Sequence, residues 1–272
     1  MYNLLIRPFV RRMDPERASS VALRYFKLIG MLPGADYVNR LIHGNKPSGL
    51  QREVFGLQFY NPVGLGAGLD RRGDLYDELE DLGFSFVEIG PLDAEAARNA
   101  IANIQANPQD DILAACIARD RVTCFSLAYD FCDFFVVEIR GIEDLMVIDK
   151  LLDIRLLNDV YRPIVIKVPE NISDSDMDTV LDYARLNGID GIETRSLRQT
   201  LNVSEICSGR LPIIANSHVR TPEEAAELLD AGASLVELRS GLVSEGPRLV
   251  SKVLRYLETL SKNADNNTDE AQ

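Results

Sequence analysis

The chain has 272 residues, 46% of them hydrophobic, and its 42 acidic and 29 basic residues give a formal net charge of −13. This length suits a single α/β barrel domain, and the acidic balance excludes a general nucleic-acid binder with a basic face. No apolar run reaches the roughly 18 residues of a membrane-spanning helix. The four cysteines and two histidines lack zinc-ligand spacing, so we expect reduced thiols and no metal.

Residues 1–60 are predicted to form a small N-terminal helical segment followed by a hairpin. Asp14 and Pro15 are typical of a helix start, and Gly34 follows the helix. A turn at Gly56 favours the hairpin. The apolar, basic-flanked stretch "YNLLIRPFV" has two interpretations. It is either a cap on the barrel or a weak peripheral contact of a cytoplasmic protein with the inner face of the membrane.

Residues 61–262 alternate short apolar runs with helix-prone stretches, which predicts a (β/α)8 TIM barrel. An open, doubly wound sheet is the alternative, but a count of eight strands favours the barrel. The expected strands are 62–68, 86–92, 122–127, 134–140, 163–169, 191–196, 211–217 and 235–241. The polar tail, 263–272, is predicted to be disordered.

Glu-x-Arg interrupts three of the expected strands, the fourth, sixth and eighth, and Glu88 lies in the second. Because the interior layers of such a barrel draw side chains from alternate strands, these glutamates are expected to share a layer, with the arginines nearer the mouth. The charges would then either close the mouth with ion pairs or form an anion site with Lys167; outward-facing side chains are a third alternative. The residues concerned are Glu88, Glu138, Glu193 and Glu237, and Arg140, Arg195 and Arg239.

Three motifs, "NPVGLGAGLDRRG", "RPIVIKVPENIS" and "GRLPIIANSHVRTPEEAAELLDAGASLVELRSGLVSEGP", resemble the dihydroorotate dehydrogenase family in its class 2, quinone-dependent branch. Members bind FMN at the mouth of a (β/α)8 barrel and oxidise dihydroorotate to orotate. The resemblance assigns Ala67 and Gly68 to the backbone against the flavin and Lys167 to the lysine beside the flavin ring. It assigns Ser240 and Gly241 to part of the final phosphate loop.

Other positions depart from the family. Arg71 replaces a lysine that contacts orotate, and Gly141 stands at the catalytic serine of the fourth strand. The third strand, read here as ending in "FSLAYD", lacks the family's Asn-x-Gly, and "NSH" (216–218) replaces a Gly-Gly phosphate turn whose backbone approaches the phosphate. We therefore expect no catalytic residue, and FMN binding that is weak or lost.

Three hypotheses about function follow. The leading one is a catalytically inactive paralogue that binds a small anion or a partner. The second is an active FMN-dependent dihydroorotate dehydrogenase (quinone) of pyrimidine biosynthesis with a rearranged site. The third is a different barrel enzyme that acts on a phosphorylated or carboxylated metabolite. The candidate cofactor- or anion-binding residues are Ala67, Gly68, Arg71, Arg140, Lys167, Arg195, Arg239, Ser240 and Gly241. The sequence does not indicate the oligomeric state.

Overall fold

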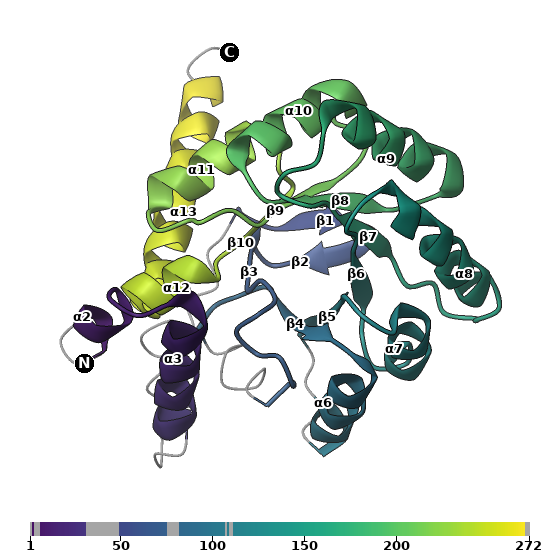
Figure 1. The fold of residues 1–272 in the computed structure, drawn as a ribbon. Coiled ribbons are helices and arrows are strands. Elements are labelled where there is room, and N and C mark those ends of the chain that lie inside the picture. Colours follow the sequence, from purple (N-terminus) through teal and green to yellow (C-terminus); the bar gives the residue numbers. More distant parts are fainter. Residues whose placement is uncertain are drawn as a thin grey trace.

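A computed structural model describes residue 2 and residues 6–30, 49–74, 82–106, 108 and 111–269. Its main feature is a sheet of eight parallel strands in the order β3-β10-β9-β8-β7-β6-β5-β4. An isolated parallel bridge between Leu65 and Val87 joins the two edge strands and closes the barrel. Seen along the barrel axis, helices form an outer ring around the strands (Figure 1). The predicted (β/α)8 barrel is confirmed.

The barrel strands are short. They are β3 (Val63–Gly64), β4 (Phe86–Leu92), β5 (Ile112–Ile117), β6 (Phe134–Glu138), β7 (Ile164–Lys167), β8 (Gly191–Thr194), β9 (Ile213–Ala215) and β10 (Leu235–Glu237).

The helices after β4 follow in chain order. They are α6 (Ala94–Ala106), α7 (Arg121–Ala128), α8 (Leu145–Leu156, after the 3-10 turn η1, Ile142–Asp144), α9 (Asp174–Asn187), α10 (Leu197–Cys207), α11 (Pro222–Asp230), α12 (Ser240–Glu245) and α13 (Arg248–Asp269). Local sequence fixes several starts. Ser196 caps α10, and Thr221 with Glu224 forms a capping box at α11.

One predicted strand is wrong. Residues 122–127 lie in helix α7, and the third barrel strand is β5. The sequence "VTCFSL" has β-branched and aromatic residues, whereas "ILAACI" carries two alanines that favour helix by propensity alone. Ala114 and Ala115 are fully buried in β5. Packing in a crowded barrel wall overrides local propensity here.

The hairpin of β1 (Arg52–Val54) and β2 (Leu57–Phe59) closes the amino-terminal end of the barrel. Phe55 and Gly56 both have positive φ, which suits a tight hairpin turn. Val54 and Phe59 pack against side chains from the first residues of several strands, among them Phe86. The hairpin lies within the ring of strands in Figure 1. Access to the interior is therefore left to the opposite, carboxyl-terminal mouth.

The N-terminal segment packs on the outside of the barrel beside α12. It contains α2 (Arg7–Val10) and α3 (Pro15–Gly30), which starts where the sequence predicts, with Asp14 accepting a hydrogen bond from the Arg17 N–H at 3.0 Å. The Tyr2 hydroxyl donates to the Val243 carbonyl. Arg7 and Arg11 both pair with Glu245. Gly34 lies outside the described residues.

The C-terminal prediction is corrected in part. Helix α13 runs to Asp269, into the segment 263–272 predicted to be disordered. Once a helix is nucleated and packed, each added residue forms one further backbone hydrogen bond, so a polar sequence can prolong it. Residues 270–272 lie outside the described residues. Among the described helices, none is long and apolar enough to cross a membrane.

Candidate functional site

Alternation along the strands directs a set of charged side chains into the barrel. On β6, Phe134 and Val136 belong to the interior cluster, and Phe135 and Val137 pack towards the helices. Residues two apart share a face, so Glu138 also points inward. The same reasoning applies to the strand glutamates Glu88, Glu193 and Glu237. All three are fully buried and come within reach of one another, although their strands β4, β8 and β10 are not adjacent. They can meet only across the interior.

Lys167, at the end of β7, is the cation of this interior. Its ammonium lies 2.5 Å from Glu193 Oε1 and 3.8 Å from Glu88 Oε1, and it is only 4% exposed. Burial lowers the pKa of Lys167, but the carboxylates of Glu193 and Glu88 outweigh burial and hold it well above its ordinary value. Lys167 is therefore a buried, charged lysine directed at carboxylates.

The pKa values of two of the buried glutamates are also raised, which for a carboxyl group favours the neutral form. Burial, with the nearby charge of Glu88, raises the pKa of Glu193 to about 7 even though Lys167 and Asn216 oppose the shift. Burial, followed by Glu88 and Glu193, raises the pKa of Glu237 well above its usual range. Three carboxylates face one ammonium, so the negative charge is in excess. Below, these three glutamates are called the carboxylate cluster.

Glu138 does not join the carboxylate cluster. Its side chain lies higher, at the mouth, where it is 32% exposed and its Oε1 accepts a hydrogen bond from Arg195 Nη2 at 2.7 Å. The register places Glu138 beside Lys167, and Lys167 beside Glu193, on neighbouring strands. Barrel stagger thus separates residues that the sequence pattern treats as one layer.

Directly above the cluster lies a cavity of about 230 Å³, called here the central cavity. Its lining residues are Ala67, Gly68, Arg71, Pro91, Cys116, Glu138, Lys167, Glu170, Arg195, Asn216, Ser217, His218, Arg239 and Ser240. Most of the predicted cofactor- or anion-binding residues lie here. Arg140 and Gly241 do not. Cys116, which sequence reasoning passed over, sits on β5, and burial raises the pKa of its thiol well above its ordinary value.

Arg239 lies across the floor that the resemblance assigns to the flavin. Its Nη1 donates to the Ala67 carbonyl at 3.2 Å. A Cβ built on Gly68 would stand 2.6 Å from the same nitrogen, so the guanidinium lies directly against Gly68. Gly241 has a packing role, because a Cβ there would stand 1.9 Å from the Val219 carbonyl oxygen. The glycine permits close contact between the first turn of α12 and the segment after β9.

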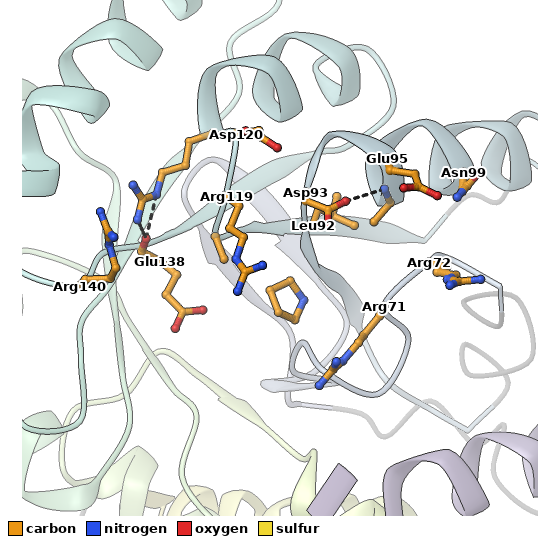
Figure 2. Close-up of a pocket in the computed structure, with 14 residues that line it drawn as sticks. Arg71, Arg72, Leu92, Asp93, Glu95, Asn99, Arg119, Asp120, Glu138 and Arg140 are labelled. Carbon is orange, nitrogen blue, oxygen red and sulfur yellow. Dashed lines mark hydrogen bonds between the residues drawn. The ribbon is translucent and has the colours of Figure 1, made fainter. Parts of the chain in front are cut away.

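A second hollow of about 980 Å³, called here the mouth cleft, adjoins the central cavity and shares Arg71, Pro91 and Glu138 with it. It opens over the carboxyl ends of β4, β5 and β6. Five arginines and four carboxylates line it: Arg71, Arg72, Arg119, Arg121 and Arg140, with Asp93, Glu95, Asp120 and Glu138. In Figure 2, Arg119 lies between Glu138 and Arg71.

The arginines of the mouth cleft differ in how they are held. Asp144 pairs with both Arg121, at 2.9 Å, and Arg140, at 3.0 Å. These hydrogen-bonded guanidinium groups lower the pKa of the Asp144 carboxyl far below its usual range, Arg140 being the larger cause. Among the described residues, the Arg119 guanidinium has no partner within hydrogen-bond or ion-pair distance. Arg119 and Arg121 were missed because the third strand was misassigned.

The predicted arginine trio is thus divided between two places. Arg195 and Arg239 line the central cavity, and Arg140 lines the mouth cleft with its side chain 76% exposed. Arg71, which lines both, connects them. Gly141, at the family's serine position, has the Glu143 carboxylate beside it: a Cβ there would stand 2.4 Å from Glu143 Oε2. No hydroxyl or thiol nucleophile occupies that position.

The protein is thus a (β/α)8 barrel with two adjoining hollows at the carboxyl ends of its strands. Residues 186–260 match the family model described as dihydroorotate dehydrogenase. A dihydroorotate dehydrogenase (quinone) of Christiangramia forsetii is 25% identical over 334 residues, covering 93% of this chain and 97% of that protein. One from Actinobacillus pleuropneumoniae is 25% identical over 342 residues, covering 95% and 99%. The chain is thus similar over most of its length to quinone-dependent dihydroorotate dehydrogenases, the family that its motifs resemble.

Solved structures agree on the fold. The dihydroorotate dehydrogenase of Eimeria tenella in complex with ferulenol superposes with a TM-score of 0.78 at 17% identity, covering 93% of each chain. Its ligand-free form gives a TM-score of 0.76 at 17% identity, covering 92% of this chain and 96% of that one. The alignments of 334 and 342 residues exceed the 272 residues of this chain, so the curated relatives carry insertions that it lacks.

Proposed function

We propose that this protein is a dihydroorotate dehydrogenase-like barrel that binds a small carboxylate or phosphate at its mouth and carries out no flavin-dependent oxidation. The observation that supports it most is the Arg239 guanidinium against Gly68 and Ala67. A tricyclic flavin ring and this side chain cannot occupy the same floor. The residues present therefore do not fit FMN in the arrangement that the family resemblance implies.

Two further features support the proposal. The central cavity by itself, without the adjoining mouth cleft, has a volume of about 230 Å³, below the roughly 300–1,000 Å³ of pockets that enclose drug-sized ligands. Lys167, in the wall of the cavity, is paired with Glu193 and Glu88. A small anion needs less room than a flavin, and arginine suits it because the guanidinium donates several hydrogen bonds in a fixed plane.

We place the anion where the mouth cleft meets the central cavity. Arg71 lines both hollows, Arg119 lines the cleft, and Arg239 lines the cavity. Neither Arg119 nor Arg239 has a carboxylate partner among the described residues, whereas Arg195 is neutralised by Glu138. Since the chain as a whole carries a formal charge of −13, these local positive charges also distinguish the mouth from the average surface.

The competing function is flavin-dependent dihydroorotate oxidation by a rearranged site. It is favoured by the names of the curated relatives and by the retained Lys167, Ser240 and Gly241. It would require Arg239 to leave Gly68 and a base other than the family's serine to take a proton. An absorbance spectrum of the purified protein, followed by FMN titration, separates the two functions. Stoichiometric flavin would establish the competing one.

Anion binding is tested by thermal unfolding in inorganic phosphate and in malonate, against chloride at matched ionic strength. Binding to the folded state alone stabilises it by RT ln(1 + [L]/Kd), about 2.7 kcal/mol at a hundredfold excess over Kd. The double variant Arg119→Ala with Arg239→Ala should abolish the rise. Arg185→Ala is the matched control, since Arg185 pairs with Asp182 on the exposed surface of α9. An equal rise in wild type and the double variant would contradict the site.

A further inference from the structure

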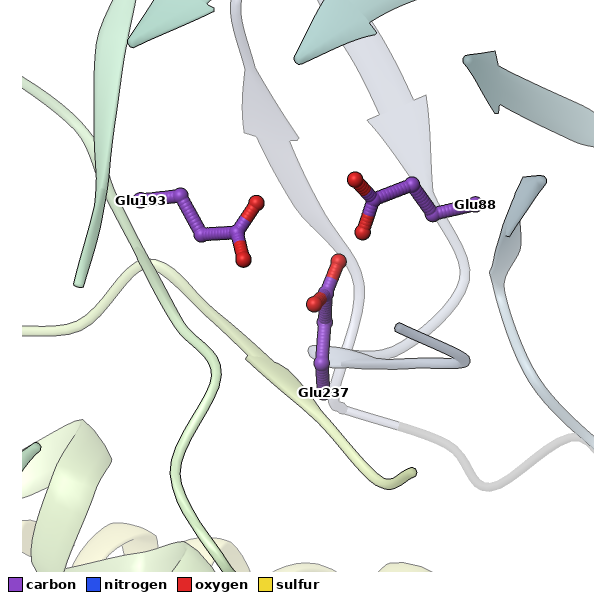
Figure 3. Close-up of side chains that lie close together, drawn as sticks. All are labelled: Glu88, Glu193 and Glu237. Atoms are coloured by element: carbon purple, nitrogen blue, oxygen red, sulfur yellow. The ribbon is translucent and has the colours of Figure 1, made fainter. Parts of the chain in front are cut away.

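A second site lies beneath the mouth, formed by the carboxylate cluster. Glu88, Glu193 and Glu237 each offer one carboxylate oxygen, and these oxygens lie within 4.8 Å of one another. Figure 3 shows the three side chains converging on a common centre from different strands. All three are fully buried. Neither the family resemblance nor the proposed anion site gives these residues a task.

The hydrogen bonds of the cluster leave an unsatisfied group. Glu88 Oε2 accepts from the Ala67 N–H at 3.0 Å. Glu193 Oε1 accepts from Asn216 Nδ2 at 2.8 Å and from Lys167 at 2.5 Å. Four other oxygens, Glu88 Oε1, Glu193 Oε2 and both of Glu237, have no hydrogen-bond partner. Buried carboxylate oxygens normally have donors, because removing them from water without one is costly.

The absence of a hydrogen-bond partner for Glu237 is the observation that indicates a ligand. It is the one member of the cluster with no donor on either oxygen, and it is directed at the other two carboxylates. Gly66 keeps the space beside it open, since a Cβ there would stand 2.5 Å from Glu237 Oε2. A carboxylate placed in this way would be repelled by its neighbours unless a positive charge or a proton shared with Glu88 stood between them.

We propose that the carboxylate cluster binds one hard divalent cation, such as Ca²⁺, Mn²⁺ or Mg²⁺. Three carboxylates and the Lys167 ammonium sum to a charge of −2, which one divalent cation neutralises. The donors are all oxygens, the ligands that these cations prefer. Two ligands on opposite sides of Ca²⁺ at 2.3–2.6 Å stand roughly 4.6–5.2 Å apart, a span that matches the limit of 4.8 Å in the cluster.

The surroundings suit such a site. The central cavity above it is lined by Lys167, Cys116 and Asn216, so the cation reaches the cluster from the mouth. Asn216 and Lys167 hold Glu193 Oε1 and leave Oε2 for the metal, the orienting role that outer ligand partners play. The ammonium also weakens the cation's binding by repulsion. This site is distinct from the arginine anion site and exists whether or not that site binds.

The cation is tested directly on protein purified without chelator. Elemental analysis should find stoichiometric divalent metal, and after EDTA treatment Mn²⁺ should raise the melting temperature and give a bound-Mn²⁺ spectrum by electron paramagnetic resonance. Glu237→Gln should weaken Mn²⁺ binding roughly 100-fold or more, because loss of a ligand exceeds the 10–100-fold cost of losing an outer partner. Glu138→Gln, on β6 and outside the cluster, should leave binding unchanged.

Lys167→Gln provides the reverse test. It changes the charge of the site from −2 to −3, so Mn²⁺ should bind more tightly and rescue the variant's stability more than that of wild type. Absence of metal, together with no response to Mn²⁺, Ca²⁺ or Mg²⁺ in wild type and in Lys167→Gln, would overturn the proposal. Protons alone would then neutralise the cluster. Equal Mn²⁺ affinity in wild type and Glu237→Gln would overturn it as well.

Discussion

Replacing Lys167 by methionine should destabilise the protein strongly when no divalent cation is present. In an effective dielectric of about 20, the contacts at 2.5 Å to Glu193 and 3.8 Å to Glu88 correspond to attractions of roughly 7 and 4 kcal/mol. The cost of burying the ammonium offsets most of this. Breaking a buried pair by removing one partner leaves a net loss of about 3–5 kcal/mol.

The measurement is thermal and urea unfolding of both proteins in EDTA, so that no cation replaces the lost charge. For a domain of this size, 1 kcal/mol corresponds to roughly 2–4 °C, which predicts a fall of about 6–20 °C in the melting temperature. The matched control is Glu138→Gln. It breaks the pair with Arg195, whose side chains are 31% and 32% exposed, and should cost no more than about 1 kcal/mol. Equal, small losses in the two variants would refute the reasoning.

Two other predictions concern acid stability and the N-terminal segment. Asp144→Asn should destabilise at neutral pH by about 3 kcal/mol, since Asp144 pairs with the buried Arg121. The folded pKa of Asp144 is depressed, so its contribution is complete above the unfolded value of about 4 and is lost as pH falls towards the folded value; the gap between variant and wild type, followed by urea unfolding, should shrink with acid. Removing residues 1–13 should lower the melting temperature, because Val10 is buried and Glu245 loses two arginine partners, and should leave co-sedimentation with anionic vesicles unchanged. A truncation that keeps its stability and loses vesicle binding would support a membrane contact instead.

The barrel could be predicted from the sequence because seven of its eight strands are short apolar runs bounded by turns and helical stretches. The remaining strand, β5, could not be predicted, because "ILAACI" is held in a strand by its pairing with β4 and β6 rather than by the propensity of its own residues. The predicted number of eight strands is correct only because the helical segment 122–127 takes the place of β5 in that prediction. Missing β5 and assigning a strand to α7 leave the predicted fold unchanged. They do change the predicted site, because Arg119, which follows β5, is left out of it.

The sequence predicts that the strand glutamates point into the barrel, but it does not predict which of the charged side chains lie together. Period-two alternation indicates which face of a strand Glu88, Glu193 and Glu237 occupy. It does not reveal the stagger that places Glu138 at the mouth. Nor does it reveal the turn after β6, where Asp144 pairs with Arg140 and holds it apart from Arg195 and Arg239. The four-residue spacing between Arg140 and Asp144 was the available signal for that pairing.

The absorbance spectrum of freshly purified protein, with FMN titration followed by flavin fluorescence, tests the central claim most directly. With Arg239 across Gly68 and Lys167 directed at Glu193, the account predicts a colourless protein and no saturable change in FMN fluorescence. A yellow protein with stoichiometric FMN, or a titration that saturates at one flavin per chain, would contradict it and establish a flavoenzyme.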